Sequence, residues 1–316
     1  MNYKIKKFFK NALYGTHAGR AIYKFCGDIT RKCRKSISDE DYLKKSFREN
    51  NGLELNLAEP RTFNEKLLWL SLHDRTPLKT LCADKYRVRE YLEKAGFASI
   101  LNELYGVYHS TSEIDFSTLP KKFVLKTNHD SGTYVIVDQD DPSTQKEIGK
   151  LDIALGKNYY LESREWQYKD IQPVILCEKF IETDEPYGLA DYRFFCSNGN
   201  ILFVAVDIGT TESNGKHGYF AKRNLYNEEF FPVDAKLKRE PFDKDLVPKP
   251  QNYDEMVRIA KTLSEPFKHV RVDLYNVQSK IIFGELTFVN GGGMQLLEPP
   301  EFNLAIGDMI DLHGKD

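Results

Sequence analysis

The sequence is poor in cysteine and has no long apolar run. Its five cysteines form no C-x-x-C pair, and Cys177 and Cys196 lie inside apolar stretches typical of strands. This usage is typical of a reducing cytoplasm, so neither structural disulfides nor a zinc site is expected. No run approaches the roughly 18 apolar residues that a membrane-spanning helix needs, and no apolar segment follows the basic N-terminus as it would in a secretory signal. We therefore expect a cytoplasmic protein.

Helix and strand patterns both occur along the 316 residues, which predicts an α+β fold with one or two domains. Apolar spacing predicts a helical stretch within 141–170 and helices at 2–14, 18–34, 39–49, 63–72, 84–95 and 253–265. Runs of β-branched and aromatic residues predict strands at 123–127, 134–138, 173–181, 191–197 and 200–207. The long polar segment that follows, 208–250, is of a kind that is usually functional or mobile inside a compact domain.

Basic residues gather at the N-terminus. Residues 1–36 contain ten Lys or Arg and one Asp, a segment charge of +9 in a chain whose net charge is -2. Apolar residues recur among them at near-helical spacing. A basic amphipathic stretch suits an anionic membrane surface, whereas the net acidity of the remainder argues against nucleic acid as a partner. The alternative is a solvated arm that packs a few aromatic residues on the main domain.

Two strand patterns near the C-terminus, at 270–275 and 284–290, predict a β-hairpin. Pairing these strands would bring Asp273 and Glu285 together on one face, beside Arg271. Two adjacent carboxylates are costly unless a cation neutralises them, and Mg²⁺ is the usual cation where phosphates bind. The alternative is a surface hairpin with ordinary charges.

A second informative stretch, 122–137, contains an apolar strand that ends in Lys126, a small polar loop and a returning apolar strand. Such a loop can turn several backbone N–H groups toward one phosphate, while the lysine adds a point charge. It is not a P-loop, because no Gly-Lys-Ser/Thr follows and the loop leads into a strand. A polar hairpin loop without a ligand is the alternative.

The chain between these stretches adds two further signals. Asn198-Gly199 between apolar runs predicts a tight hairpin, and strand alternation places Asp191 and Arg193 on one face. Upstream, Asp84-Lys85 opens the helix expected at 84–95.

Taken in order, these segments resemble the ATP-grasp superfamily, and more closely its TupA-like (teichuronopeptide biosynthesis) family. The resemblance covers roughly residues 60–310. The residues that carry it are Phe63-Asn64-Glu65-Lys66, Ala83-Asp84-Lys85-Tyr86, Leu119-Pro120-Lys121-Lys122-Phe123-Val124-Leu125-Lys126, Asp191-Tyr192-Arg193-Phe194-Phe195, Arg271-Val272-Asp273-Leu274-Tyr275 and Gly284-Glu285-Leu286-Thr287.

The resemblance implies an ATP-grasp fold, in which two α+β subdomains clasp ATP. A basic helical arm at 1–60 would precede a catalytic domain at 61–316. Within that domain, a nucleotide lid at about 116–182 would face a metal-binding subdomain at about 183–316.

The resemblance also implies that Mg²⁺ is held by Asp273 and Glu285. The wider superfamily commonly has an asparagine two residues after the glutamate, and this chain has Thr287 there. A hydroxyl is a weaker ligand, so either Asn290 takes that place or a single metal ion predominates.

ATP is the other cofactor implied, and each remaining site residue has an implied role. Arg193 and Arg271 would stabilise the transferred phosphoryl group and the oxyanion of the tetrahedral intermediate. The glycine run 291–293 would line the acceptor pocket. The nucleotide would be held by the phosphate-binding residues Lys85, Lys126, Asn128, Ser131 and Gly132, the adenine-binding backbone of Glu178, Lys179, Phe180 and Ile181, and a ribose-binding carboxylate from Glu185 or Asp191.

The activity implied is ATP-dependent ligation of a carboxylate to an amine through an acyl phosphate. The implied substrates are an amino acid and a uronic acid of a cell-surface polysaccharide, such as a capsule or O-antigen, or of its lipid-linked precursor. The basic arm fits a cytoplasmic enzyme that is peripheral at the inner face of the membrane. The alternatives are a sugar kinase on the same fold and a non-catalytic accessory protein of polysaccharide biosynthesis.

Overall fold

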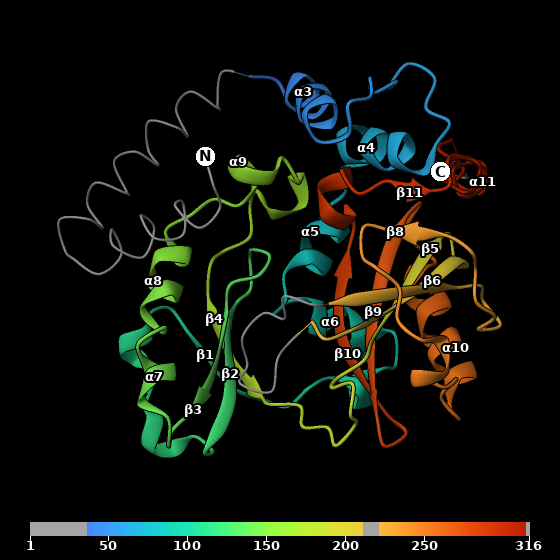
Figure 1. Cartoon of the computed structure of the whole chain (residues 1–316). Helices are drawn as coiled ribbons and strands as arrows, with labels where there is room; N and C mark the ends of the chain where they lie inside the picture. Colours follow the sequence, from blue (N-terminus) through green and yellow to red (C-terminus); the bar gives the residue numbers. More distant parts are fainter. Residues whose placement is uncertain (1–36, 211–220, 314–316) are drawn as a thin grey trace.

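The computed structural model describes residues 37–210 and 221–313, and the predicted helices 2–14 and 18–34 and the basic segment 1–36 lie outside these ranges. The described chain forms two lobes, each built on an antiparallel sheet (Figure 1). This is the predicted α+β class. None of the described helices is both long and apolar enough to cross a membrane.

The smaller lobe contains a sheet in the order β1-β4-β2-β3, with α7 and α8 beside it (Figure 1). On β2, Phe123 and Leu125 are buried in a core with α8, whereas Lys126 lies on the opposite face. The elements are β1 (Leu104–Tyr108), β2 (Lys122–Thr127), β3 (Tyr134–Asp138), β4 (Ile175–Lys179), α7 (Pro142–Gln145) and α8 (Gly149–Leu155).

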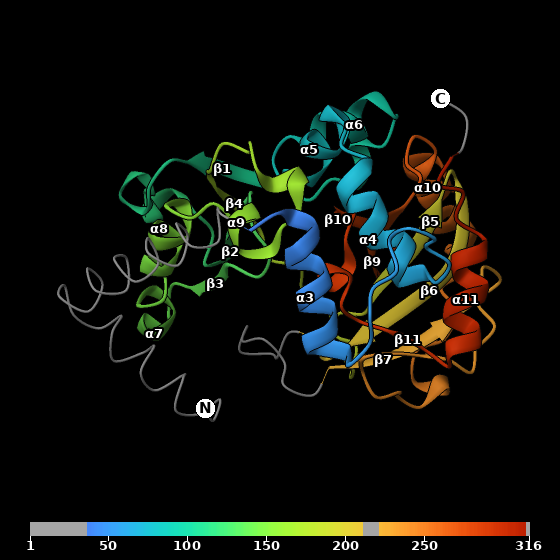
Figure 2. The same cartoon turned by 90° about the horizontal axis from the view of Figure 1, so that it is seen from above.

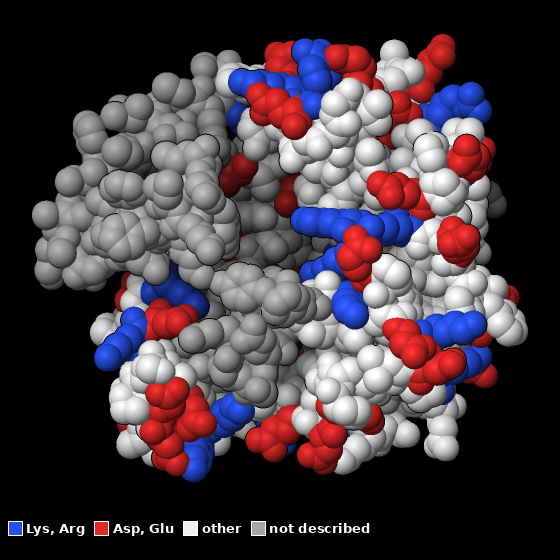
Figure 3. Space-filling model, in the orientation of Figure 1, with Lys and Arg blue, Asp and Glu red and all other residues white. Residues whose placement is uncertain are grey.

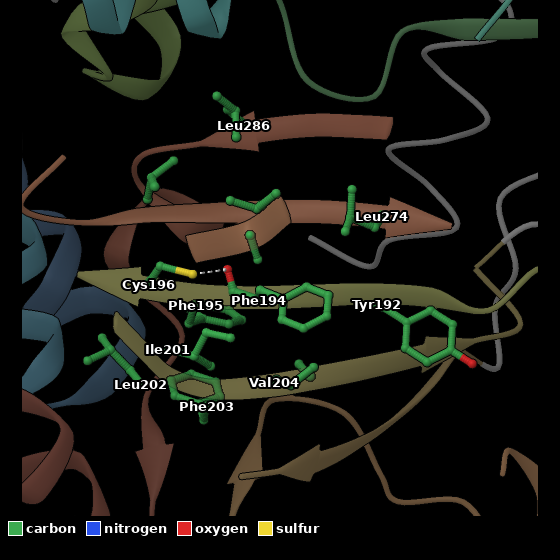
Figure 4. Packing of buried hydrophobic residues seen from close by; sticks show 14 of the residues in the cluster. Tyr192, Phe194, Phe195, Cys196, Ile201, Leu202, Phe203, Val204, Leu274 and Leu286 are labelled. Atoms are coloured by element: carbon green, nitrogen blue, oxygen red, sulfur yellow. Dashed lines mark hydrogen bonds between the residues drawn. The ribbon is translucent and has the colours of Figure 1, made fainter. Parts of the chain in front are cut away.

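The larger lobe contains a sheet in the order β10-β9-β5-β6-β7, and α10 (Tyr253–Ser264) packs on one face. Figure 4 shows Phe194, Val204 and Leu274 on three neighbouring strands of this sheet, and all three are fully buried. The strands are β5 (Asp191–Ser197), β6 (Asn200–Ile208), β7 (Lys222–Tyr226), β9 (Val270–Val277) and β10 (Lys280–Thr287).

The opposite face of this sheet is apolar at one end and charged at the other. At the apolar end, Phe63 of α4 (Phe63–His73) packs against Phe195 and Phe203, with ring centroids 6.1 and 6.0 Å apart. Helix α11 (Pro300–Asp308) packs on α4, and a short ladder joins β8 (Lys236–Leu237) to β11 (Leu297–Glu298). Helix α4 therefore covers the apolar end of this face.

Helix α3, several shorter helices and 3-10 turns complete the described fold. Helix α3 (Asp39–Asn51) buries Leu43 and Phe47 in the main core, and Figure 2 shows it between the smaller lobe and α4. Its Tyr42 hydroxyl donates to the carbonyl of Glu162 at 2.9 Å. The remaining elements are α5 (Pro77–Ala83), α6 (Val88–Lys94), α9 (Tyr160–Ser163) and the 3-10 turns Trp166–Tyr168 and Asn290–Gly293.

Two predicted hairpins are confirmed. Asn198 and Gly199 form a two-residue turn with φ of 47° and 79°, and Asp273 pairs directly with Glu285. The turn between β9 and β10 consists of Gln278 and Ser279, with φ of 50° and 62°.

Two predicted helices are wrong in extent. The segment predicted as a helix at 84–95 becomes helical only at Val88, because the Asp84 carboxylate accepts the backbone N–H groups of Tyr86 and Arg87 and holds a turn there. The stretch 141–170 is divided into α7, α8, α9 and a 3-10 turn, with Arg164 at a φ of 61°. The strand predicted at 173–181 is shortened to β4, and the polar segment 208–250 contributes β7 and β8.

Gly307→Ala should destabilise the protein, because an added Cβ would lie 2.0 Å from the backbone oxygen of Arg61, where α11 crosses the start of α4. Overpacking of this kind typically costs about 1–3 kcal/mol. Thermal and urea unfolding would measure the loss. Gly149→Ala in α8 is the matched control, since no atom lies within 4 Å of its added Cβ, and it should be neutral or slightly stabilising. Equal stability of both variants would mean that α11 can shift away from α4 at no cost.

Candidate active site

The charged residues of the larger lobe share one face of its sheet. Glu285 pairs with Asp273 across β10 and β9, and Asp273 pairs with Arg193 across β9 and β5. Directly opposed residues of antiparallel strands point to the same side. A neighbouring row on the same face contains Asp191, Asp207 and Arg223, which pair across β5, β6 and β7.

Arg271 donates hydrogen bonds to all four residues predicted to bind metal. It is 5% exposed, and its Nε and Nη2 donate to the two carboxylate oxygens of Asp273 at 2.6 and 2.5 Å. Nη2 also donates to Glu285 Oε1 at 2.9 Å and to Thr287 Oγ1 at 3.1 Å. Nη1 donates to Asn290 Oδ1. Both candidates for the third metal ligand therefore lie in one cluster with the two carboxylates.

The two carboxylates of this cluster differ in accessibility. Burial raises the pKa of Asp273 to about 7, although Arg271 opposes this shift. Burial acts in the same direction on Glu285, but Lys85 and then Arg271 outweigh it and hold the pKa of Glu285 at about 2. The Glu285 side chain also keeps 38% of its surface exposed, compared with 4% for Asp273. Glu285 is therefore the ionised carboxylate that is open to a bound cation.

The oxygen atoms of this cluster fit Mg²⁺ that is bound together with phosphates. Among the described residues, no group of three or more His, Cys, Asp or Glu is placed to hold a metal ion. Mg²⁺ at a nucleotide typically takes one or two carboxylates, because phosphate oxygens and water fill its other positions. Asp273 and Glu285 supply that number. Coordination through these oxygens would require Arg271 to give up part of its present contacts.

A second charge cluster joins the predicted residues Asp191 and Arg193 to Asp207, Arg223 and Arg239, which the sequence reasoning missed. Arg193 Nη2 donates to Asp191 Oδ2 at 2.5 Å, and its Nη1 lies 3.2 Å from Asp207 Oδ2. Asp207 is fully buried, accepts from Arg223 at 2.5 and 2.6 Å, and also accepts from Arg239. Figure 3 shows Lys and Arg side chains gathered over β7 and β8, on the larger lobe. Three guanidinium groups therefore share the Asp207 carboxylate.

Lys126 and Glu178 form an ion pair on the smaller sheet, with 2.7 Å between Lys126 Nζ and Glu178 Oε2. The backbone that follows Glu178 borders a cavity of about 790 Å³. A volume of this size is typical of a small-molecule site. The walls come from both lobes and include Lys179, Phe180 and Ile181 on one side and Val277 and Ile282 on the other.

Lys85 reaches the loop between β2 and β3. Its Nζ donates to the carbonyl oxygen of Asp130 at 2.5 Å. The Asp130 carboxylate in turn accepts from the hydroxyls of Thr127 and Thr133, each at 2.5 Å. The loop is thus closed on itself and attached to the segment that carries Lys85.

The other predicted residues of this loop have different environments. Asn128 is 1% exposed; its amide donates to Asp84 and its Oδ1 accepts from the N–H of Val174 at 2.8 Å. Ser131 and Gly132 are exposed at the tip of the loop. In this structure the Asn128 side chain holds the loop in place, and the tip is the part that a ligand can reach.

The two ribose candidates also differ. Asp191 is buried and paired with Arg193, whereas Glu185 is exposed on the linker between β4 and β5. The structure therefore brings Arg193, Asp191 and the metal cluster together and leaves Glu185 at the edge of the lobes.

Glu165 is a further buried carboxylate that the sequence reasoning missed. It is 7% exposed and precedes the turn Trp166–Tyr168. Burial raises the pKa of Glu165 to about 8, and the charge of Glu285 adds to this shift, while Lys85 and Arg271 oppose it. The charges that shift its pKa therefore belong to residues of the predicted site.

Asp207→Asn should destabilise the protein by about 3–5 kcal/mol, because the neutral amide leaves three arginines without their shared counter-charge. Urea unfolding followed by circular dichroism would measure the loss. Glu240→Gln removes an exposed carboxylate from the loop after β8 and should cost less than about 1 kcal/mol. A loss for Asp207→Asn as small as that of the control would mean that other groups neutralise the arginines.

A protein-family model described as TupA-like ATP-grasp matches residues 65–311. A comparison with curated proteins finds no match.

The chain is similar, at 14% identity, to an L-amino acid ligase from Bacillus licheniformis, with a TM-score of 0.43 over 73% of this chain and 49% of that one. It is also similar, each at 14% identity and a TM-score of 0.40, to D-alanine–D-alanine ligases from Bacillus anthracis, in complex with ATP, and from Helicobacter pylori. These two matches cover 66% and 78% of this chain and 55% and 68% of those chains. The chain thus spans about half the length of the first two structures. Because the family model covers most of its length, this chain belongs to the TupA-like ATP-grasp family.

Proposed function

We propose that this protein is an ADP-forming carboxylate–amine ligase, which joins an amino acid to a uronic acid of a cell-surface polysaccharide or of its lipid-linked precursor. Family membership supports an ATP-dependent ligase in general. The observation that carries the proposal is the pairing of Asp273 with Glu285, beside Arg271 and in register with Arg193.

The proposed reaction has two steps. A carboxylate oxygen attacks the γ-phosphorus of ATP, ADP leaves, and an acyl phosphate is formed. The amine then attacks the acyl carbon, and phosphate leaves with the electrons of the carbon–oxygen bond. Neither step needs a covalent bond to the protein, so the protein's contribution is positioning and charge neutralisation.

The cations of both lobes suit these steps. Lys126 and Lys85 would bind nucleotide phosphates from the side of the smaller lobe, with the loop tip at Ser131 and Gly132 above them. Arg193 and Arg271 would stabilise negative charge on the transferred phosphoryl group and on the tetrahedral intermediate. Mg²⁺ at Asp273 and Glu285 would neutralise the charge that develops on the phosphate oxygens.

The cavity between the lobes suits the base of the nucleotide. Its wall includes the backbone after Glu178, which would bind the edge of adenine, together with apolar side chains of the β9–β10 hairpin. Either Glu185 or Asp191 would then bind the ribose. The exposed position of Glu185 favours it, because the Asp191 carboxylate is already paired with Arg193.

The most direct test is mass spectrometry of the products formed from ATP, Mg²⁺, a panel of amino acids and uronic-acid glycans. A ligase yields ADP, free phosphate and an amide whose mass is that of both substrates less one water. A phosphate ester of the glycan, without free phosphate, would instead identify a sugar kinase.

Glu285→Gln should abolish turnover while leaving the fold intact, because it removes the exposed carboxylate that would balance the metal. Loss of several kcal/mol of transition-state stabilisation corresponds to a rate decrease of about 10³-fold or more. ADP release measured at several Mg²⁺ concentrations would quantify it. Glu301→Gln, an exposed change on α11, is the control. Near-normal rates for Glu285→Gln at ordinary Mg²⁺ would remove Glu285 from the metal site.

Residues 1–36 are proposed to hold the enzyme at the inner face of the membrane, near lipid-linked glycan. A chain that begins at Ile37 keeps Ser38, the N-cap of α3, and should fold and use ATP with soluble acceptors. It should lose binding to anionic liposomes, and binding of the whole protein should weaken with salt, because each Lys or Arg near such a surface contributes about 1 kcal/mol. Co-sedimentation would measure both effects. Insolubility of the shortened chain, with no liposome binding by the whole protein, would instead make the segment part of the fold.

A further inference from the structure

Buried carboxylates in the two sheets are paired with cations. Asp273 is paired with Arg271, Glu178 with Lys126, and Asp207 with three arginines. A buried carboxylate is costly to ionise unless a cation or several hydrogen-bond donors compensate for the lost water. These pairs supply that compensation.

In the part of the chain that the structure describes, Glu165 lacks such compensation. Among residues 37–210 and 221–313, it has no Lys, Arg or His nitrogen within 4.0 Å of its carboxylate. Its hydrogen-bond neighbours are neutral: Gln167 Nε2 donates to Glu165 Oε2 at 3.2 Å, and the Ser163 hydroxyl accepts the backbone N–H of Glu165 at 3.1 Å. Asp84, which also forms no ion pair in the described chain, instead accepts three N–H groups.

The surroundings of Glu165 connect it to the candidate active site. The charges that act on it are those of Glu285, Lys85 and Arg271. Its segment follows α9, which lies between the lobes at their upper end in Figure 1, and the turn Trp166–Tyr168 packs on α5. Helix α5 in turn packs on β10, the strand of Glu285, and ends directly before Asp84 and Lys85, so Glu165 lies near the candidate active site on an element that belongs to neither sheet.

We propose that Glu165 binds the protonated amino group of the amine substrate and accepts one of its protons before the attack. This inference rests on the ligase activity proposed above. An ammonium group supplies the one kind of partner that Glu165 lacks, a cation that also donates hydrogen bonds. A protonated amine has no lone pair and cannot attack, so a ligase needs a group that removes a proton close to the acyl phosphate.

The proton and electron balance of this step is complete. One proton passes from the ammonium nitrogen to the Glu165 carboxylate, and the lone pair set free forms the nitrogen–carbon bond. The carbon–oxygen bond to phosphate breaks, and phosphate leaves with the electron pair of the broken bond. The second proton leaves the nitrogen with the departing phosphate. A carboxylate whose pKa is raised by burial to about 8 is a better proton acceptor than an exposed one.

The geometry favours an ammonium group over a second metal ion at Glu165. If Glu165 shared a metal ion with Asp273 and Glu285, the three would form a group of close acidic ligands, and the described residues contain no such group. The neighbouring cations Lys85 and Arg271 also oppose a second doubly charged ion more strongly than a single positive charge.

Two nucleophiles can distinguish this role from others. Hydroxylamine is uncharged at neutral pH and traps an acyl phosphate as a hydroxamate, whereas an amino acid enters as an ammonium ion. Glu165→Gln keeps the size of the side chain and an oxygen that accepts from Gln167. We expect it to retain hydroxamate formation and to lower kcat/KM for the amino acid about 10- to 100-fold, the usual effect of losing a hydrogen bond between charged groups.

Two further variants complete the experiment. Glu165→Asp keeps the charge and should recover part of the amino-acid rate. Glu162→Gln removes an exposed carboxylate from α9 and should leave both rates unchanged. Equal losses with both nucleophiles in Glu165→Gln would assign Glu165 a structural role, and a higher Mg²⁺ requirement would make it a metal ligand. If the wild-type enzyme formed neither product, the ligase activity itself would be wrong, and this inference would fall with it.

Discussion

The larger lobe depends on mutual neutralisation of the charges that strand alternation places on one face of its sheet. Arg271 is central to it, since one buried guanidinium holds side chains from β9, from β10 and from the turn that follows. An unpaired charge in this position would cost several kcal/mol. The register of β9 and β10 is therefore fixed by electrostatics as well as by the apolar residues on the other face: a shift by one residue would bury the charges under α10.

The same strands also make the site rigid. On β5, Arg193 faces the charged end of the sheet, and Phe195, two residues later, stacks on Phe203 with a centroid separation of 4.2 Å and contacts Phe63 of α4. The backbone that carries the charged side chains is thereby clamped by an aromatic core within two residues of the site. Side chains on such a support lose little freedom when a ligand binds, which favours electrostatic stabilisation of a transition state.

Local patterns in the sequence were sufficient to place part of this site. Alternation put Arg271 and Asp273 on one face of β9, and the predicted strand pairing brought Glu285 to the same face, although a register shift between Phe283 and Glu285 makes that pairing possible. The Asn-Gly turn predicted the hairpin of β5 and β6. A regular hairpin at this turn would place Val206 opposite Asp191, and a register shift between Phe195 and Cys196 places Asp207 there instead. Glu165 could not be found in this way, since a helical spacing at 141–170 hid a break that depends on Arg164 in a left-handed conformation. Arg239 was equally hidden, because its contact with Asp207 depends on the path of a long loop and on no local periodicity.

The positive groups proposed to bind ATP all have partners within the protein. Lys126 is paired with Glu178, Lys85 with the carbonyl of Asp130, and Arg271 with Asp273. Nucleotide binding would therefore exchange partners, and only the difference between old and new contacts would contribute to affinity. Such pairing has a physical advantage, because it keeps flexible cationic side chains ordered before the phosphates arrive. A metal ion that reached Asp273 and Glu285 would take over the carboxylates from Arg271, and the guanidinium would then be available to the phosphoryl group. In this arrangement the charge that stabilises the protein before a ligand binds would be the charge that acts on the substrate.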